Sequence, residues 1–222
     1  CLTNVPENRL PFPQPPGYDP EWFTLLARYI RAGVWDAMNL HKMMPNGKTD
    51  LNNYGAVSTD FIGQNHRWPE GSYAEREEIF QAHFRYNLGM LYFLANDERV
   101  PKRIRDEVRQ WGLPADEFPE TGHWTPQLYV REARRMIADV VMTEHHCRGF
   151  KKVEDSVGLA AYTMDSHNCR RLVLDGRVVN EGNVEVPPTE PYPISYRAIV
   201  PKGDECTNLL VPVCLSASHI AF

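Results

Sequence analysis

Apolar residues recur at helical spacing in three stretches of the first half of the chain. Each stretch carries an end signal: Asp19 before a first-turn proline, a capping box of Ser72 and Glu75, and a glycine at Gly112 that suits a helix end. The predicted helices cover residues 20–42, residues from 72 through at least 92, and residues 101–112. A proline-rich extended arm over residues 1–19 is expected before them.

Beyond about residue 122 the pattern changes to short apolar runs. Strands are predicted at residues 157–162, 196–200 and 209–215, an extended segment at 127–131, and a turn of helix within 133–143. Asp175-Gly176 stands between two β-branched runs, which is a strong signal for a hairpin. The fold class predicted is therefore α+β, with a helical N-terminal half followed by a strand-rich half.

The composition is that of a folded chain. It has 222 residues, 42% of them hydrophobic and 24% charged, and a formal net charge of −5 at pH 7. No stretch approaches the roughly 18 apolar residues of a membrane-spanning helix. No basic block is present that would neutralise the phosphates of a nucleic acid. We expect a water-soluble protein of one or two domains, without nucleic-acid or membrane partners.

Cysteine and histidine give little reason to expect a metal. The five cysteines form no CxxC pair, so we expect unpaired and mostly buried thiols. Glu144, His145 and His146 offer ligand types, but adjacent histidines of an extended chain point to opposite sides and the helical HExxH spacing is missing. A surface or capping role is predicted for them, and a metal hydrolase is the alternative.

The polar loop over residues 45–71 is rich in groups that bind hydroxyls. Asn53, Asp60 and Asn65 supply amides and a carboxylate, and Trp68 supplies a ring face on which a sugar can stack. This combination favours a polyhydroxylated ligand. The alternative is that these residues serve only the local hydrogen bonding of turns.

Two further places carry candidate chemistry. Asp165 and His167 are two residues apart and share a face if the chain is extended, so the acid can orient the imidazole for proton transfer; a structural network at a strand end is the alternative. His219 follows Ser216-Ala217-Ser218, small residues that permit close approach of a flat cofactor. The chain contains no glycine-rich GxGxxG or GxxxxGK[ST] turn, no GxSxG and no HExxH.

Six blocks of the sequence carry a resemblance to a known family. They are residues 8–13 with 17–20, 53–70, 127–136, 162–167, 191–197 and 208–219, and the Gln-Leu-Tyr-Val-Arg-Glu-Ala-Arg-Arg-Met run at 127–136 is the most specific. In this order they resemble the FAD-dependent oxidoreductases, bacterial flavoproteins whose fold is similar to the glutathione-reductase group. The resemblance implies oxidation of a hydroxylated small substrate by hydride transfer to FAD. Family members associated with carbohydrate breakdown suggest that the substrate is derived from a sugar.

The resemblance also implies roles for particular residues. His167 and His219 would lie nearest the flavin ring, with Asp165 orienting His167. The remaining implied contacts are Tyr129, Arg131 and Arg134 to the substrate, with Arg135 as an alternative to either arginine, and Ser216 and Ser218 to the cofactor.

The missing glycine-rich turn is a departure from the family pattern. We therefore expect residues 1–200 to be the substrate domain, and residues 201–222 to be a remnant strand of the FAD-binding domain, of a larger enzyme. By itself such a piece would not bind FAD tightly or turn over substrate. The unpaired strand at 209–215 would favour either a homo-oligomer or a poorly ordered tail. A bacterial cytoplasm or periplasm both fit. A carbohydrate-binding module without catalysis, using Trp68 and Trp124, is the alternative.

Overall fold

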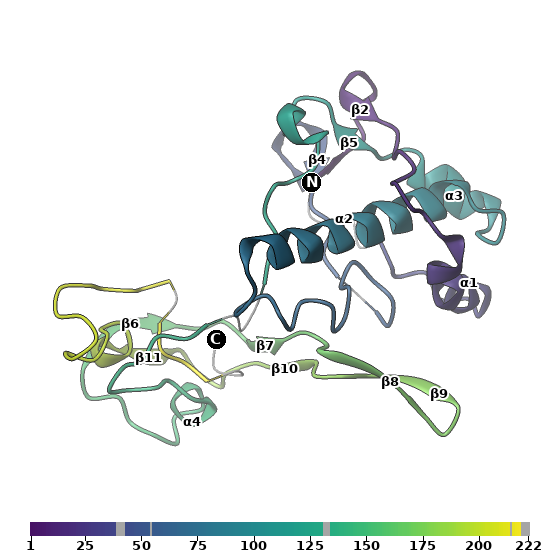
Figure 1. The fold of residues 1–222 in the computed structure, drawn as a ribbon. Coiled ribbons are helices and arrows are strands. Elements are labelled where there is room, and N and C mark those ends of the chain that lie inside the picture. Colours follow the sequence, from purple (N-terminus) through teal and green to yellow (C-terminus); the bar gives the residue numbers. More distant parts are fainter. Residues whose placement is uncertain (39–42, 54, 131–133, 214, 219–222) are drawn as a thin grey trace. The chain divides into compact units, whose positions relative to one another are not determined.

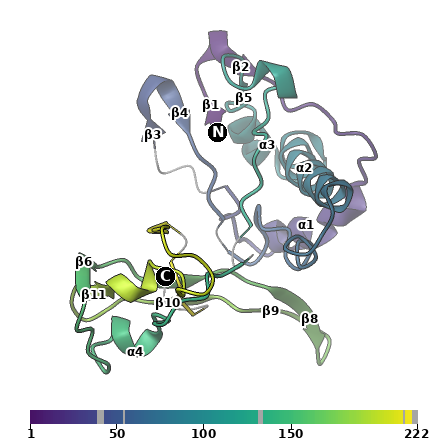
Figure 2. The same ribbon diagram turned by 60° about the vertical axis from the view of Figure 1, so that its left-hand side comes forward.

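The computed structural model describes residues 1–38, 43–53, 55–130, 134–213 and 215–218 (Figures 1 and 2). It divides the chain into two compact units, residues 1–129 and 130–222, called unit 1 and unit 2 below. Unit 1 holds the long helices, and unit 2 holds most of the longer strands. The α+β prediction is confirmed. The assignment of residues 1–200 to a substrate domain and 201–222 to a cofactor domain stays a prediction.

Helix α2, Tyr73–Asn96, is the centre of unit 1 (Figure 1). It begins at the predicted capping box, because the Glu75 N–H donates to Ser72 Oγ (3.3 Å) and the Ser72 N–H donates to the Glu75 carboxylate (2.8 Å). The 3-10 turn η2 (Pro20–Phe23), which leads into α1 (Thr24–Arg31), and helix α3 (Lys102–Val108) both contact α2. Within the described residues, no helix is both long and apolar enough to cross a membrane.

The N-terminal arm is extended, as predicted, and it is built into unit 1. Strand β1 (Leu2–Thr3) of the arm pairs with β4 (Lys48–Thr49), and β4 also pairs with β3 (Met43–Met44). Strand β2 (Arg9–Leu10) of the arm pairs with β5 (Leu113–Pro114). The 3-10 turn η1 (Pro6–Asn8) connects β1 to β2, η3 (Pro45–Gly47) connects β3 to β4, and η4 (Pro119–Thr121) follows β5. Leu2 and Phe12 of the arm are buried in the core.

Two predicted helix ends are wrong. The helix expected over 20–42 ends at Arg31, because the chain leaves the helix at Gly33, whose φ of 91° lies in the left-handed region. Helix α3 ends at Val108, and Gly112 is not its cap. Instead the Gly112 N–H donates to the Thr3 carbonyl (3.0 Å) and the Gly112 carbonyl accepts from the Thr3 N–H (2.9 Å), which ties the arm to the segment after α3.

Unit 2 consists of antiparallel strand pairs around a small core. The pairs are β6 (Ser156–Ala160) with β11 (Tyr192–Ser195), β7 (Met164–Ser166) with β10 (Val184–Val186), and β8 (Arg170–Leu174) with β9 (Arg177–Glu181). The short helix α4 (Glu144–Cys147) and the 3-10 turn η5 (Tyr196–Ala198) complete it. The β8–β9 hairpin confirms the prediction from Asp175-Gly176, whose φ values of 49° and 74° suit a tight hairpin turn.

Three other predictions in this half are wrong. Residues 196–200 begin with η5 rather than a strand, and the described residues of 209–215 lie in no strand. Residues 134–143 contain no helical turn. Leu209, Leu210 and Val213 are exposed, because an apolar run forms a strand only where a neighbour offers a ladder of hydrogen bonds.

The described cysteines and histidines form neither a disulfide nor a metal-binding group. Cys1, Cys147, Cys169 and Cys206 form no disulfide among the described residues, and because only Cys147 of these is buried, the expectation of mostly buried thiols is wrong. No group of three or more His, Cys, Asp or Glu side chains among the described residues is placed to hold a metal ion. His146 has a capping role, as predicted, since its Nδ1 accepts from the Thr143 N–H at 3.0 Å.

Asp155 is the polar anchor of the β6–β11 end of unit 2. Its carboxylate accepts hydrogen bonds from Ser195 Oγ (2.8 Å) and from the backbone N–H and Nε of Arg197 (3.0 and 2.9 Å). The Arg197 guanidinium, joined by the other hydrogen bonds, holds the pKa of Asp155 far below its usual range. The contribution to stability is therefore present above the ordinary carboxyl pKa of ~3.9 and declines as the pH falls below it.

Asp155→Asn is expected to lower the free energy of unfolding of unit 2 by about 2 kcal/mol at neutral pH, because a charged acceptor of several hydrogen bonds is lost. The difference from the wild type should shrink as the pH falls below ~4. Hydrogen exchange of the Arg197 amide measures it. Asp204→Asn, at an exposed carboxylate of the same unit, is the control and should change little. A deficit that is the same at acidic and neutral pH would contradict the assignment to the charge.

Candidate functional site

Two cavities lie beside α2 in unit 1. The first cavity, of ≈ 330 Å³, lies against α2 between Phe80 and Leu91, and the second, of ≈ 730 Å³, lies against α2 between Tyr73 and Phe84. Both volumes fall within the roughly 300–1,000 Å³ that small-molecule sites span. Every residue that lines either cavity belongs to unit 1.

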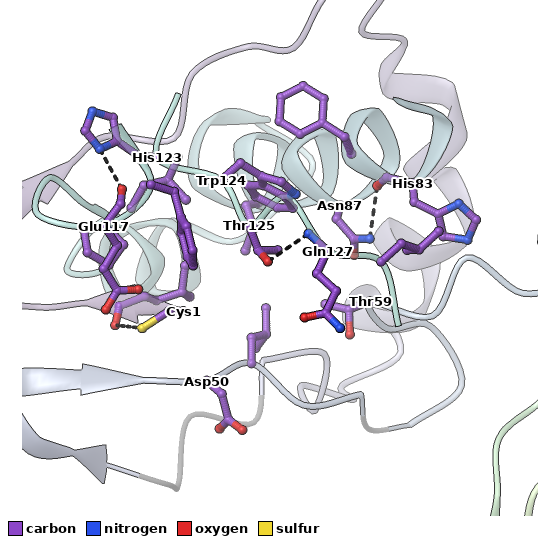
Figure 3. A pocket seen from close by; sticks show the side chains of 18 of the residues that line it. Cys1, Asp50, Thr59, His83, Asn87, Glu117, His123, Trp124, Thr125 and Gln127 are labelled. Carbon is purple, nitrogen blue, oxygen red and sulfur yellow. Dashed lines mark hydrogen bonds between the residues drawn. The ribbon is translucent and has the colours of Figure 1, made fainter. Parts of the chain in front are cut away.

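Aromatic rings wall the first cavity (Figure 3). Phe80 and Phe84 project from α2, and Trp124 approaches from the segment after η4, with its ring edge-on to Phe84 at 5.3 Å between centroids. In Figure 3 the helix that carries His83 and Asn87 lies above the cavity and the loop that carries Asp50 lies below it. Apolar walls with a few converging polar groups are typical of ligand sites.

The segment that delivers Trp124 is held in a strained conformation. Phe118 and His123 both have positive φ, 50° and 64°, and Gly122 between them has a φ of 70°. For a residue other than glycine this conformation costs on the order of 1–3 kcal/mol, and such strain concentrates at functional sites. Thr121 Oγ1 secures the turn by donating to the Trp124 carbonyl at 2.5 Å. Phe118, His123 and Trp124 all line the first cavity.

His83 presents one ring nitrogen as a hydrogen-bond acceptor. Its Nδ1 lies 2.8 Å from the Ile79 carbonyl. A carbonyl only accepts, so Nδ1 carries the proton and Nε2 carries a lone pair. Burial lowers the pKa of His83, whose exposed fraction is 8%, and this outweighs the opposite effect of the Ile79 hydrogen bond. The imidazole is therefore neutral at pH 7.

Asn87, one helical turn further along α2, carries an unsatisfied oxygen. Its Nδ2 donates to the His83 carbonyl at 3.1 Å, which fixes the orientation of the amide because the oxygen cannot take that position. Its Oδ1 is buried and has no hydrogen-bond partner among the described residues. Leaving a buried acceptor unpaired costs about 1–3 kcal/mol. Asn87 lines the first cavity, so a ligand that donates a hydrogen bond there would recover this cost.

The second cavity has more exposed aromatic surface and a basic group. Arg76 is fixed by Nε and Nη2 donating to the carbonyls of Trp68 and Pro69, each at 2.9 Å, and its guanidinium lies over the Trp68 ring at 5.9 Å. Tyr73, which is 90% exposed, is the first residue of α2 and lines the same cavity. Gln81 Nε2 donates to the Glu77 carboxylate at 2.9 Å.

Two of the residues predicted to bind substrate line these cavities. Trp68 lines the second cavity and Tyr129 lines the first. Asn53, Asp60 and Asn65 line neither. Their loop contains tight turns, in which the Gln64 N–H donates to the Phe61 carbonyl and the Trp68 N–H donates to the Asn65 carbonyl. For part of the loop, the structure therefore agrees with the alternative that these residues serve the local hydrogen bonding of turns.

The predicted proton-transfer residues belong to unit 2. Strand β7 buries Met164 and Ser166 and turns Asp165 to the opposite face, with His167 two residues further on. The alternation is the one expected if Asp165 and His167 lie on the same face of the chain. That Asp165 orients His167 stays a prediction. Arg134 is exposed. Arg131 and His219 lie outside the described residues.

Ser216 and Ser218 have most of their backbone groups occupied. The Ser216 N–H donates to Ala198 (2.8 Å), its carbonyl accepts from Met142 (2.9 Å), and the Ser218 N–H donates to Met142 (2.8 Å). The Ser216 side chain is 2% exposed. Direct contact of these serines with a cofactor would therefore have to come through the Ser218 hydroxyl or through movement of the segment.

Comparison with known proteins decides the family. A family model described as "FAD dependent oxidoreductase" matches residues 1–222. The chain belongs to this family. The cofactor of this family is thus FAD, and its activity is an oxidation or a reduction. No curated protein and no solved structure matches the chain.

Neither the segment of Ser216 and Ser218 nor the start of α2 fits the pyrophosphate of FAD. The Ser216 and Ser218 N–H groups are committed to backbone carbonyls, as described above. At the start of α2 the capping box places the Glu75 carboxylate where an anion would bind. A pyrophosphate needs free N–H groups and no competing carboxylate.

The sequence pattern missed His83 and Asn87 as site residues. Both stand on the apolar face of α2 at a spacing of four residues, where a core helix would carry two apolar side chains. Two polar residues in register on a buried helical face were the signal that was available.

Proposed function

We propose that the first cavity of this FAD-dependent oxidoreductase binds the substrate, and that the substrate is an uncharged, hydroxylated molecule of the carbohydrate class. The observation that carries the proposal is the buried Oδ1 of Asn87, which has no partner among the described residues, in a cavity that His83, whose Nε2 is the unprotonated ring nitrogen, also lines. Hydroxyl groups are the donors that satisfy both acceptors.

The charge of the first cavity supports an uncharged ligand. Its charged side chains are the carboxylates of Asp50 and Glu117, the second of which pairs with Lys48 at 2.6 Å. None of the described residues that line it is a lysine or an arginine. An anionic substrate would meet two carboxylates there, one of them already paired with Lys48, whereas hydroxyl groups can donate to these carboxylates.

The ring walls support a sugar over a flexible polyol. Sugar rings have apolar faces that pack on aromatic side chains, and Phe80, Phe84 and Trp124 supply such surface beside the polar groups. On the family resemblance alone, His167 and His219 accept the proton, Asp165 orients His167, and Arg131 and Arg134 contact the substrate. A binding module without catalysis would use the same cavity, but the family match over the whole chain favours the enzyme.

Calorimetric titration with neutral sugars and with the matching sugar acids tests the proposal. At least one neutral sugar should bind saturably, and its acid counterpart should bind at least about tenfold more weakly, a difference of ~1.4 kcal/mol. Equal or tighter binding of the acids, or binding of none of the sugars, would refute it.

Binding should also depend on pH in a stated direction. A hydroxyl donates to Nε2 only while His83 is neutral, so affinity should be constant near neutrality. It should fall about tenfold per pH unit below the pKa of His83, which burial places under its ordinary ~6.5. The other charged or titratable groups that line this cavity are Asp50, Glu117, His123, Tyr129, and the thiol and N-terminal amine of Cys1. His83→Gln should remove this dependence and His123→Gln should keep it; the opposite result would exclude His83 as the acceptor.

A further inference from the structure

We propose that the two cavities are subsites of one groove, and that the substrate is therefore an oligosaccharide of at least two rings rather than a monosaccharide. This inference rests on the proposed function and extends it. The first cavity takes the ring whose hydroxyls meet His83 and Asn87, and the second cavity takes the next ring along the chain of sugars.

The two cavities share a wall. Phe80, Phe84, Trp124, Thr125, Gln127 and Leu128 line both of them. A ligand in either cavity therefore touches the same residues of α2 and of the segment after η4. A molecule that fills both would pass over this wall without leaving the protein surface.

The second cavity offers the chemistry of a sugar subsite. Tyr73 and Trp68 supply ring surface, and one face of Trp68 is covered by Arg76, whose position is fixed by two backbone carbonyls. Gln81 and Glu77 are already hydrogen-bonded to each other, so they form an ordered polar edge. Aromatic platforms flanked by fixed polar groups suit a ring with one apolar face and a rim of hydroxyls.

The volumes point the same way. The second cavity, at ≈ 730 Å³, is larger than the first at ≈ 330 Å³. The first alone is at the small end of the roughly 300–1,000 Å³ range of ligand sites. A monosaccharide held by His83 and Asn87 would leave the larger cavity and its exposed Tyr73 without a role in binding.

The test is a length series of sugars and the variant Tyr73→Ala. Calorimetry would compare β-1,4-linked glucose, xylose, mannose and galactose series, each from the monosaccharide to the tetrasaccharide. In the series that binds, the disaccharide or trisaccharide should bind at least about tenfold more tightly than the monosaccharide. Tyr73→Ala should remove this gain and leave monosaccharide affinity unchanged. Because Tyr73 is 90% exposed and the Ser72–Glu75 cap does not use its side chain, the variant should fold.

Tyr162→Ala, at a 69% exposed tyrosine of unit 2, is the matched control and should keep the gain with length. Monosaccharide affinity equal to that of the longer sugars would overturn the two-subsite groove while leaving the proposed function intact. An equal loss at every length in Tyr73→Ala would overturn it too, because the effect would then be structural. Absence of binding by every sugar would refute the proposed function itself.

Discussion

Gly112→Ala is expected to destabilise unit 1 by about 3 kcal/mol, within the range of severe packing defects. A Cβ at this position would overlap the carbonyl oxygen of Leu10 and lie 2.6 Å from Cγ of Arg9. Relief would require the backbone of the arm to move away. That movement would break the paired hydrogen bonds between Gly112 and Thr3, and Leu113 and Pro114, which line the first cavity, follow directly.

Urea unfolding followed by tryptophan fluorescence measures this effect. All five tryptophans, Trp22, Trp35, Trp68, Trp111 and Trp124, lie in unit 1, so the signal reports that unit alone. Gly158→Ala, which lies in unit 2 and is therefore followed by circular dichroism, is the control, because a Cβ at Gly158 meets nothing within 4 Å and its backbone is not left-handed. It should be neutral or slightly stabilising. Equal stability of Gly112→Ala and the wild type would show that the arm is not packed as described.

Asn87→Leu is expected to weaken sugar binding by about 10-fold to 100-fold without lowering stability. The variant removes an acceptor that has no partner in the described protein, and leucine has a similar shape. Replacing an unsatisfied buried polar group by an apolar one is neutral or stabilising, whereas the ligand hydroxyl loses its acceptor and stays buried. Calorimetry and urea unfolding of the same preparation measure the two quantities.

Asn96→Leu provides the matched control for this prediction. Asn96 Nδ2 donates to the Tyr92 carbonyl at 2.9 Å, the same bond to the preceding turn that Asn87 makes, but Asn96 is exposed and lines neither cavity. The control should leave affinity unchanged. If Asn87→Leu binds sugar as tightly as the wild type, or unfolds much more easily, Asn87 is a structural residue.

Local signals in the sequence predicted the elements whose causes are local. The capping box at Ser72 and the Asp175-Gly176 turn each depend on a few adjacent residues, and both are present. The predictions that were wrong depended on distant partners. The role of Gly112 is set by Thr3 and Leu10, and residues 209–215 would need a neighbouring strand. Neither partner can be identified from periodicity.

The candidate site was predictable only in part for the same reason. Trp68 was predicted because a ring in a polar loop suits a sugar, and Tyr129 was predicted from the family resemblance; both line a cavity. The cavity itself is assembled from segments far apart in the chain, around Asp50, Asn87 and Trp124, and no short motif describes it. The acceptor role of His83 follows from its bond to Ile79, which only the folded helix defines.

The location of the bound substrate is the most direct test of the central claim. Two-dimensional NMR of the protein, titrated with the tightest-binding neutral sugar, would follow the Trp124 indole N–H and the side-chain amides of Asn87 and Gln127. Saturable shifts at these groups, larger than at the amides of unit 2, are the predicted result. Saturable shifts confined to the surroundings of His167 in unit 2, with Asn87 and Trp124 unchanged, would contradict the assignment of the substrate to the first cavity.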